Sequence, residues 1–571
     1  METKTHSCIV IGTGAAGFSA ACRLKRLGVS VAMVTEGIKF GTSRNTGSDK
    51  QTYYKLGLSG DRADSVRKMA QNLFDGGCVD GDNALCEASL SSRSFLHLCE
   101  LGVPFPTNRY GEYVGYKTDH DPYERATSAG PLTSKYMTEA LEKEARALEI
   151  PIYDKIRAVK ILVHDNRVCG FIGMKKSGLI AFRCGDLVLA TGGPAGIYAD
   201  SVYPACHRGA TGLAVEAGAK LQNPALWQYG LASANPRWNV SGSYMQVLPR
   251  FVSIDENGKE HDFLWDFFQD RYRGLSLVFL KGYQWPFDPK KAENGSSLID
   301  LAVHRERVEK GRRVFLDFMH NPFDMDFSKL SGEAYDYLKR AGVCFGTPIE
   351  RLEKMNAPAV ELYREKGVDL HREYLEIALC AQHNNGGIGV DLWWQSSVKG
   401  LFAVGECAGT HGISRPGGSA LNAGQVGALR AAQYVASHPS PMPKEDLFCS
   451  LAGKVKIRKE PDAPEKLRLV QRRMSDTAAA VRDPERIRAT LQAVLKELDR
   501  TADPDLRDVL LTQGAVLTAM AKPNGDPESV QEVLWDESGY RLSLRRVRPI
   551  PRDDDFFENV WRSFRETKNV F

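Results

Sequence analysis

Closely spaced cysteine pairs are absent from this sequence. Its 12 cysteines are scattered, and none forms the CxxC spacing that zinc sites, iron–sulfur clusters and haem attachment use. We therefore expect no metal site built by this chain alone. Scattered thiols also fit a reducing compartment, where they are mostly buried as small apolar side chains, and we expect a cytoplasmic protein.

Long apolar runs and a strong charge imbalance are also lacking. No apolar run approaches the ~20 residues that span a bilayer, and the first expected strand begins near residue 7, which leaves no room for a signal peptide. The formal net charge of +4 is too small to indicate binding to nucleic acid or to a membrane. The basic segment 545–548 is therefore interpreted as a solvated surface or as a partner for carboxylates. A length of 571 residues predicts about two to four domains.

The most informative feature present is a glycine-rich phrase near the amino terminus. An apolar run at 7–11 predicts a buried parallel strand, and Gly12-Thr13-Gly14-Ala15-Ala16-Gly17 follows it directly. In a GxGxxG pattern the first glycine permits a tight turn, the second lets the backbone approach a pyrophosphate, and the third lets the helix pack on the strand. The small-residue stretch that follows predicts a helix whose free amides and dipole face the phosphates.

A second strand and an acidic residue complete a dinucleotide-binding pattern. Residues 29–34 predict the second strand, which ends at Thr35-Glu36. An acid roughly 20 residues past the glycines is placed to bind a ribose hydroxyl. The pattern predicts a dinucleotide site without distinguishing FAD from NAD. The alternative is a helix–sheet contact made by small residues with no ligand.

Glycine-rich phrases far along the chain favour FAD. Residues 186–193 predict a buried strand that ends in a flexible turn beside the cofactor. A second phrase, from 405 through 419, opens a helix that continues to about residue 435. The free amides and dipole at that helix start are suited to negative charge on a reduced flavin. Because an NAD enzyme has no need of this second phrase, the predicted cofactor is FAD.

Changes in composition divide the chain into segments. Residues 228–381 are aromatic, charged and rich in irregular loops, which predicts a cap domain inserted into the cofactor domain. Helical periodicity at 463–521 predicts a terminal bundle, and the last ~50 residues lack a regular pattern. We expect an α/β fold with a Rossmann-like FAD-binding domain, an inserted α+β cap domain and a C-terminal helical domain. The expected boundaries are 1–227 and 382–440 for FAD binding, 228–381 for the cap, and 441–571 for the helical domain and tail.

The order of these phrases resembles one enzyme family over nearly the whole chain. The first glycine motif and residues 190–193, 386–388 and 400–406 follow the order found in the flavoprotein subunits of succinate dehydrogenase and fumarate reductase. L-aspartate oxidase and adenylylsulfate reductase are relatives of that family. Residues 411–421 look like the family phrase HGxNRLGGNSL and are the most specific match. The resemblance implies an FAD-dependent oxidoreductase whose active site lies where the cap meets the flavin.

Several residues depart from the family pattern. Covalent members attach FAD through a histidine, and Asn45 stands at that position, so we expect non-covalent FAD. Gly230 and Gln382 stand where the family has substrate-binding histidines, with His383 one position after Gln382. The phrase that carries the family's catalytic arginine, RGEGG, is absent, and Arg250 is the nearest candidate. These departures indicate a substrate other than fumarate or succinate.

Four side chains are candidates for catalysis. Arg415 is the strongest, because a guanidinium binds a carboxylate through two parallel hydrogen bonds and because it precedes a helix expected to face the flavin. His383 and His411 are candidates for orienting substrate or moving a proton, and Arg250 is a weaker candidate for the proton donor. The structural alternatives are a surface salt bridge for an arginine and a satisfied core donor for a histidine. The residues expected to bind the cofactor are Gly12, Gly14, Ala15, Ala16, Gly17, Glu36, Asn45, Thr46, Gly47, Thr191, Gly192, Gly193, Glu406, Gly418, Ser419, Ala420 and Leu421.

These observations predict an FAD-dependent oxidoreductase that reduces, or dehydrogenates, a C–C bond of a carboxylate- or carbonyl-bearing substrate by hydride transfer at flavin N5. The alternatives are an amino-acid oxidase of the L-aspartate oxidase kind, a flavoprotein like that of adenylylsulfate reductase, and a flavin-binding scaffold without turnover. The chain has no cluster motif and no second GxGxxG for a nicotinamide cofactor. Electrons are therefore expected from an iron–sulfur or other electron-transfer subunit. The expected small-molecule substrate is anionic, and we expect neither nucleic-acid binding nor direct membrane insertion.

Overall fold

The apolar run before the first glycines lies at the centre of a parallel sheet in the computed structural model, which describes residues 1–60 and 62–552. The strand order is β19-β10-β2-β3-β6, and every pairing is parallel. Strand β2 is buried at all its positions because it has neighbours on both sides. Segments from near both ends of the chain therefore build one sheet. Its strands are β2 (Cys8–Ile11), β3 (Val31–Val34), β6 (Ile152–Tyr153), β10 (Asp186–Leu189) and β19 (Leu401–Ala403).

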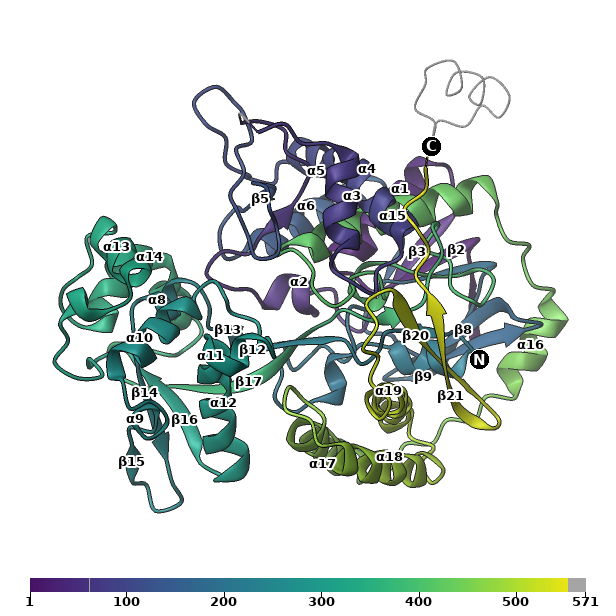
Figure 1. The fold of residues 1–571 in the computed structure, drawn as a ribbon. Helices are drawn as coiled ribbons and strands as arrows, with labels where there is room; N and C mark the ends of the chain where they lie inside the picture. The colour runs from purple at the N-terminus through teal and green to yellow at the C-terminus, as the bar shows by residue number, and fades with distance from the viewer. Residues whose placement is uncertain (61, 553–571) are drawn as a thin grey trace.

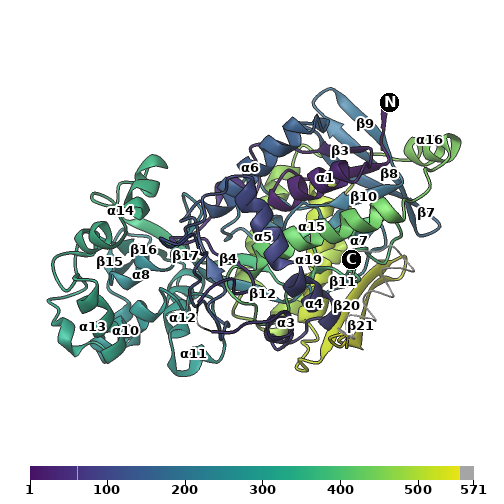
Figure 2. The ribbon, with the colours of Figure 1, turned by 90° about the horizontal axis from the view of Figure 1, so that it is seen from above.

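Two helices rich in small residues pack against each other beside this sheet. Helices α1 (Ala15–Arg26) and α15 (Ser419–Ser437) lie side by side in Figures 1 and 2. A methyl group added at Gly424 of α15 would stand 3.4 Å from the Cβ of Ala16 on α1. The small side chains thus allow a close approach, and α6 (Thr133–Ala147) packs on another part of α1.

A second sheet is built from the chain between β6 and β10 together with the first strand of the protein. Its order is β1-β9-β8-β7, and it contains β1 (Glu2–Thr5), β7 (Arg157–His164), β8 (Arg167–Lys175) and β9 (Gly178–Arg183). The expectation that the first strand begins near residue 7 is wrong, because β1 precedes it. Strand β1 is mostly exposed and sits at the sheet edge, so it lacks the apolar run that identified β2.

The segment between β3 and β6 is mainly helical and lies above the sheets in Figure 1. A short strand pair separates the helices, and it brings residues 53–54 against 126–127. The elements are α2 (Thr42–Asn45), β4 (Tyr53–Tyr54), α3 (Val66–Phe74), α4 (Gly81–Ser89), α5 (Ser91–Glu100) and β5 (Ala126–Thr127).

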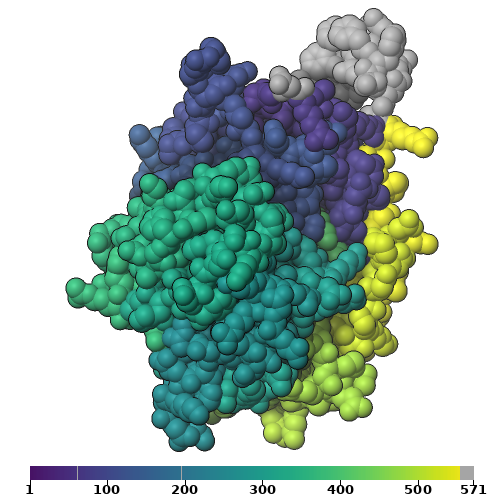
Figure 3. Space-filling model, turned by 60° about the vertical axis from the view of Figure 1, so that its left-hand side comes forward, coloured from purple at the N-terminus to yellow at the C-terminus, as the bar shows by residue number. Residues whose placement is uncertain are grey.

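Residues 227–384 surround a six-stranded sheet, and we call them the six-stranded unit. The strand order is β13-β12-β17-β16-β14-β15, and all its pairings are antiparallel. Figure 1 shows that β12 and β17 connect this unit, at the left, to the rest of the chain, and in Figure 3 it forms the teal and green lobe at the front. Its strands are β12 (Trp227–Ser233), β13 (Trp238–Asn239), β14 (Arg250–Ile254), β15 (Glu260–His261), β16 (Arg313–Asp317) and β17 (Leu375–Asn384). Its α-helices are α8 (Ser243–Gln246), α9 (Leu264–Phe267), α10 (Arg271–Leu280), α11 (Lys291–Asn294), α12 (Ser297–His304), α13 (Gly332–Arg340) and α14 (Pro348–Glu365).

The expected helical periodicity at 463–521 corresponds to three helices. They are α17 (Ala463–Thr477), α18 (Pro484–Leu498) and α19 (Pro504–Met520), and α16 (Glu445–Gly453) precedes them. Proline lies in the first turn of each of the three, where a missing N–H costs no hydrogen bond. The side chains of Asp483 and Asp503 cap α18 and α19 by accepting backbone N–H bonds.

The expectation that the last ~50 residues are irregular is wrong for the part that the structure describes. Strands β20 (Ser529–Asp536) and β21 (Gly539–Arg546) form a hairpin that pairs with β11 (Leu221–Gln222), which in turn pairs with β18 (Gly387–Ile388). The hairpin was missed because β21 is largely polar and exposed at the sheet edge. Residues 553–571 of the expected tail lie outside the described residues.

The basic segment 545–548 binds carboxylates, one of the two interpretations of its sequence. Arg545 donates two hydrogen bonds to Asp80 and one to Glu532. Arg548 bonds the carboxylate of Asp82. These contacts fasten the end of the described chain to the start of α4. Within residues 1–60 and 62–552, no helix combines the length and apolar character needed to cross a membrane.

Candidate active site

A cavity of about 1380 Å³ extends from the glycine turn after β2 to the six-stranded unit. The carboxyl ends of β2, β3, β10 and β19 all open onto it, which is where open parallel sheets bind ligands. Ordinary small-molecule pockets measure about 300–1,000 Å³. The cavity is therefore large enough for an elongated cofactor together with a second, smaller ligand.

The first glycine turn forms one end of this cavity through close backbone contacts. Gly12 has a φ of +111°, and a methyl group added there would stand 2.2 Å from the carbonyl oxygen of Ala190. A methyl group at Gly17 would stand 2.1 Å from the carbonyl oxygen of Gly12. Gly14 precedes α1 and offers no side-chain cap, so the start of α1 presents backbone amides beside the cavity. This is the geometry that binds a pyrophosphate.

The expected acidic residue lies at the same end of the cavity. Glu36 lines the cavity, and its carboxylate is 3.2 Å from the guanidinium of Arg157. Asp508, from α19, also lines this end, and burial raises the pKa of its carboxyl to about 6. His207 lies nearby, with Nε2 2.9 Å from the carbonyl oxygen of Gly193. Arg157, His207 and Asp508 were missed by sequence reasoning because they belong to separate segments with no motif.

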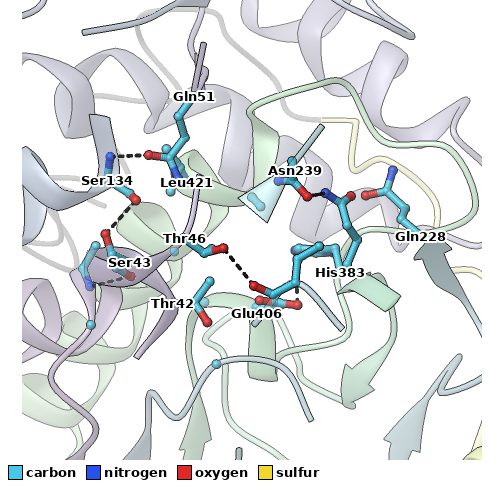
Figure 4. A pocket seen from close by; sticks show the side chains of 18 of the residues that line it. Thr42, Ser43, Thr46, Gln51, Ser134, Gln228, Asn239, His383, Glu406 and Leu421 are labelled. Atoms are coloured by element: carbon cyan, nitrogen blue, oxygen red, sulfur yellow. Dashed lines mark hydrogen bonds and ion pairs between the residues drawn. The ribbon is translucent and has the colours of Figure 1, made fainter. Parts of the chain in front are cut away.

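The second glycine phrase forms the opposite wall. Gly418 has a φ of +89° and is the residue before α15. Its left-handed conformation turns the chain so that Ala420 and Leu421 line the cavity at the helix start. Between the two glycine phrases, the segment from Thr42 to Thr52 completes the wall. Figure 4 shows it tied to α6, where Ser134 donates to the carbonyl oxygen of Ser43 at 2.8 Å.

Arg415 lies three residues before Gly418 and faces the cavity. Its Nε is buried without a hydrogen-bond partner, and within the described residues its guanidinium makes no salt bridge. Burial lowers the pKa of Arg415 to about 10, against the opposing influence of Glu406 and Tyr203. It therefore remains a cation at neutral pH. A half-buried cation without a salt bridge, beside a large cavity, is suited to bind an anion.

Two histidines lie against this cation. The rings of His383 and His411 are in edge contact with centroids 4.9 Å apart, and His383 lines the cavity. Burial, followed by the charge of Arg415, lowers the pKa of both, to about 3 for His411. Nδ1 of His383 is 2.9 Å from the side-chain oxygen of Asn385, while Nε2 of each ring has no partner within residues 1–60 and 62–552. Because their pKa values are lowered, both imidazoles are neutral at pH 7.

Glu406 connects this cluster to the turn after β10. Figure 4 shows it beside His383, whose Nε2 is 3.9 Å from the Glu406 carboxylate. Tyr203 donates a hydrogen bond to Glu406, and the backbone amide of Asn384 donates another at 3.1 Å. Burial raises the pKa of Glu406 to about 7, although these bonds and Arg415 favour its ionised form.

Neutral amides and an indole ring line the part of the cavity within the six-stranded unit. Gln382 donates to Asn239 at 2.6 Å, and Gln228 lies on the adjacent strand (Figure 4). The indole of Trp285 covers Gly230, where an added methyl group would stand 2.5 Å from the ring. Its Nε1 donates to the carbonyl oxygen of Leu231 at 3.0 Å, which holds the ring in place. Sequence reasoning noted the missing histidine at 230 but had no signal for the tryptophan that fills its space.

The cavity brings together most residues expected to bind the cofactor. Those that line it are Gly12, Gly14, Ala15, Ala16, Glu36, Thr46, Thr191, Gly192, Glu406, Gly418, Ala420 and Leu421. Five expected residues are not part of its lining, namely Gly17, Asn45, Gly47, Gly193 and Ser419.

Each of these five has another contact. Gly17 supports the close packing of α1 on the glycine turn, and Gly47 packs against the ring of Trp238. The amide of Asn45 donates to the carbonyl oxygens of Lys39 and Gly41, so it turns back onto its own loop. Gly193 packs against the carboxylate of Glu406, and Ser419 faces a second, smaller cavity.

Arg250 lies outside the cavity lining. It is the first residue of β14, in the six-stranded unit, and it binds Asp262 at 2.7 Å and Asp317 at 3.3 Å. These carboxylates raise its pKa above the ordinary value, which makes it a still weaker acid. The geometry gives no support to Arg250 as a proton donor. Its contacts are those of an arginine in salt bridges.

The residues present fit FAD. The cavity combines a glycine turn and helix start suited to a pyrophosphate with the start of α15 and the unpaired cation Arg415 at its far wall. Glu36 at the first end offers a carboxylate that can accept a hydrogen bond from a ribose hydroxyl. No group of three or more metal-binding side chains comes together within the described ranges.

Comparison with known proteins supports this interpretation. A family described as "FAD binding domain" matches residues 7–421, more than half of the chain. The chain is 25% identical over 449 residues to a fumarate reductase (CoM/CoB) subunit from Methanothermobacter marburgensis, covering 76% of this chain and 73% of that protein. It is 24% identical over 452 residues to the L-aspartate oxidase of Bacillus subtilis, covering 77% and 73% of the two chains.

Solved structures share the fold over almost the entire chain. Mycobacterium smegmatis Sdh1 matches with a TM-score of 0.73 and 19% identity, covering 97% of this chain and 96% of that one. Adenylylsulfate reductase from Archaeoglobus fulgidus matches with a TM-score of 0.63 and 15% identity, covering 97% of both chains. At such identities the likeness describes the fold alone, a mixed α/β fold with several sheets.

Proposed function

Since this chain belongs to the FAD binding domain family and is an FAD-dependent oxidoreductase, we propose that it reduces or dehydrogenates a C–C bond of a carboxylate- or carbonyl-bearing substrate larger than fumarate or succinate. The observation that carries the proposal is Arg415, a half-buried cation that faces the cavity and whose Nε is buried without a protein partner. A planar guanidinium binds a carboxylate through two parallel hydrogen bonds and withdraws electron density from an adjacent C=C bond.

The two histidines beside Arg415 add no second positive charge to the site. Both imidazoles beside Arg415 are neutral at pH 7 because burial and that cation lower their pKa values. Bound FAD supplies a hydride donor or acceptor at N5. The chain's own residues then have three tasks: Arg415 binds the substrate anion, the backbone at the start of α15 faces the cofactor, and the walls exclude water.

The six-stranded unit supports a substrate other than a small dicarboxylate. In this unit Gln228 and Gln382 present neutral amides to the cavity, and Lys291 and Glu333 bring one charge of each sign. Trp285 adds an apolar wall over Gly230. An acid or ketone with a polar or aromatic extension complements such a wall. These contacts support the proposed substrate class. A panel of unsaturated acids and ketones with different substituents would identify which extension the wall accepts.

The proposed arrangement of domains follows the expected boundaries. Residues 1–227 and 382–440 would form the FAD-binding part, 228–381 the cap, and 441–571 a C-terminal part that contains both helices and the β20–β21 hairpin. The nearly coincident limits of the six-stranded unit support this division. We also propose that FAD is held without a covalent bond, since Asn45 has no ring nitrogen for a bond to the flavin and lies outside the cavity lining.

Electrons have to reach the flavin from elsewhere. Relatives of this chain are named as subunits, including the fumarate reductase (CoM/CoB) protein of M. marburgensis and a succinate dehydrogenase flavoprotein of B. subtilis. We therefore expect a partner with iron–sulfur clusters or another redox group. Copurification of a clustered protein with the tagged chain from its native host would support this, and an isolated chain that turns over rapidly with free reduced flavin would contradict it.

The test is a panel of acceptors applied to the FAD-loaded protein. The flavin is photoreduced without oxygen, and its reoxidation is followed by absorbance after adding fumarate, longer unsaturated acids, aryl-substituted unsaturated acids or unsaturated ketones. We expect reoxidation by a member larger than fumarate and a loss of that rate in Arg415→Met. The matched control is Arg430→Met, which removes another buried arginine from the α15 region outside the cavity.

Other outcomes point to the alternatives. If no unsaturated acid or ketone reoxidises the flavin, the proposal fails. Rapid reoxidation by air with an amino acid as the donor would instead favour an oxidase like the L-aspartate oxidase relatives. Flavin reduction that requires both sulfite and a nucleotide would favour chemistry like that of adenylylsulfate reductase.

A further inference from the structure

A second, much smaller cavity lies on the far side of Arg415 from the main one. Its volume is about 10 Å³, close to the space that one water molecule needs. It is enclosed by apolar side chains of α3 and α4 and by the segment that leads into α15. The polar residues in its lining are Glu87, Thr410, His411, Arg415 and Ser419.

The polar atoms around this cavity have no protein partners. Oε1 of Glu87, Oγ1 of Thr410, Nε2 of His411, Nε of Arg415 and Oγ of Ser419 are all buried without a hydrogen bond in the described part of the chain. Glu87 is 3% exposed and His411 is 4% exposed. Buried polar atoms are almost always hydrogen-bonded to protein or to ordered water. Five such atoms around one water-sized space indicate a bound water that several of them share.

The same residues connect the small cavity to the main one. Arg415 lines both cavities. His411 lines the small cavity and contacts the ring of His383, which lines the main cavity. A continuous row of polar side chains thus runs from Glu87 on α4 to the place where the substrate is proposed to bind.

Glu87 is suited to hold a proton at neutral pH. Burial raises the pKa of its carboxyl to about 8, and the Thr410 hydroxyl opposes this shift. The groups that face it from the neighbouring elements are His411 and Arg415 from the segment before α15, Ser419 at the start of α15, and apolar Leu73 from α3. Of these, Arg415 is the cation at pH 7.

We propose that Glu87 supplies the proton for the reaction in the main cavity and passes it through the shared water, His411 and His383. The inference rests on the proposed function, in which saturating a C=C bond takes one hydride from the reduced cofactor and one proton from the protein. The proton leaves the Glu87 carboxyl for the shared water, and His411 accepts a proton at its unpartnered Nε2 while releasing one from its other nitrogen. His383, whose Nδ1 is held by Asn385, accepts that proton at Nε2 and gives it to the substrate carbon as a short-lived imidazolium. Glu87 is left as a carboxylate and regains a proton from solvent through the main cavity after the product leaves. In dehydrogenation the same groups carry the proton in reverse.

Glu87 acts through other residues, so a loss of rate alone would not distinguish a proton donor from a residue that only supports the fold. The pH dependence of the rate makes that distinction. In wild-type holoenzyme, the rate of flavin reoxidation by an accepted substrate should fall as the pH rises through about 8, because the acid form is required. Glu87→Gln keeps the shape but has no acidic proton, and should slow the reaction about 100- to 10,000-fold and remove this pH dependence. Glu87→Asp restores a carboxyl and should recover part of the rate with an inflection.

The matched control is Glu144→Gln. Glu144 is a similarly buried glutamate on α6, paired with Arg26 at 2.6 Å and outside both cavities. Its variant should keep the wild-type pH profile. A Glu87→Gln enzyme with the wild-type rate and the wild-type profile would overturn the proposal.

A second measurement separates this proposal from the proposed function. Infrared difference spectra of oxidised holoenzyme, wild type minus Glu87→Gln, should contain a protonated-carboxyl band at pH 7 that disappears above about pH 8. If the band is present but no unsaturated acceptor reacts with wild type, Glu87 does hold a proton at pH 7 and the proposed substrate class fails. If the band is missing at pH 7, Glu87 is not protonated and cannot supply the proton, whatever the acceptor panel shows.

Discussion

Replacing Arg415 with methionine is expected to weaken substrate binding and, at the same time, to stabilise the substrate-free holoenzyme. The guanidinium has no hydrogen-bond partner at Nε, and burial lowers its pKa to about 10. Because this value still lies far above 7, Arg415 is charged in both the folded and the unfolded protein at pH 7, and the whole cost of burying the charge is present. At about 1.4 kcal/mol for each pKa unit, the cost has an upper limit of the order of 3 kcal/mol.

Removing this charge leaves no new unpaired ion. Glu406 is the nearby carboxyl whose ionised form Arg415 favours, and its pKa is about 7. Without Arg415 that pKa rises further, so Glu406 becomes neutral at pH 7. The stabilisation should appear as a rise of about 2–3 °C in the thermal midpoint at a fixed excess of FAD, if the chain unfolds in one transition.

Substrate binding should change in the opposite direction. Losing a desolvated partner of a carboxylate costs about 2–5 kcal/mol, which corresponds to a rise of about 30- to 4,000-fold in the dissociation constant. Equilibrium titration of the oxidised holoenzyme with the acid identified in the acceptor panel measures it. Added acid should also raise the thermal midpoint of wild type and leave that of the variant unchanged.

The matched comparison is Arg430→Met. The guanidinium of Arg430 stacks over the ring of Trp393, 3.6 Å from its centroid, and donates to the carbonyl oxygen of Leu392. Since this arginine has protein partners, its loss should lower the thermal midpoint and leave substrate binding intact. If Arg415→Met lowers the midpoint as Arg430→Met does and still binds the acid with wild-type affinity, then Arg415 is a structural residue and the reasoning is refuted.

Three further predictions follow from particular contacts. Gly230→Ala places a methyl group against the Trp285 ring and should lower the free energy of unfolding, measured in urea, by about 1–3 kcal/mol. Combining it with Trp285→Leu should restore that free energy. An unaffected single variant would show that the ring moves freely. Arg250→Gln should leave kcat/KM unchanged, because Arg250 is paired with Asp262 and Asp317 outside the cavity; a large loss would show that it enters the site in another position of the six-stranded unit. Arg545→Met should destabilise the protein by about 1–3 kcal/mol, since it removes one of the cations bound to buried Asp80; urea denaturation measures this, and an unchanged midpoint would mean that Arg548 alone satisfies that carboxylate.

Local patterns were sufficient for the parallel sheet and for the two glycine phrases. A buried strand followed by Gly12, Gly14 and Gly17 requires a tight turn, and the backbone contacts within 2.2 Å of an added methyl group show why no other residue serves at Gly12. The start of α15 after Gly418 was predictable for the same reason, since its left-handed conformation favours glycine. These features depend on the backbone of a few consecutive residues, which is the information that a short stretch of sequence contains.

The residues around the substrate side depended on tertiary structure. Gly230 and Trp285 are 55 positions apart in sequence, and only the packing of their loop on β12 puts the ring over the glycine. Arg250 was chosen by its distance along the chain from a missing motif, whereas the fold pairs it with carboxylates on neighbouring strands and loops.

The sequence by itself was sufficient to predict a dinucleotide site at the edge of a parallel sheet and to place Arg415 just before the helix expected to face it. Only the tertiary structure decided which other side chains share that space, because burial and the distances between groups are properties of the folded chain. Glu87 is the clearest case: no motif contains it, and a glutamate on a helix surface is ordinarily ionised. Its enclosure between α3, α4 and the start of α15 shields the carboxyl from bulk solvent and makes it a candidate acid at neutral pH.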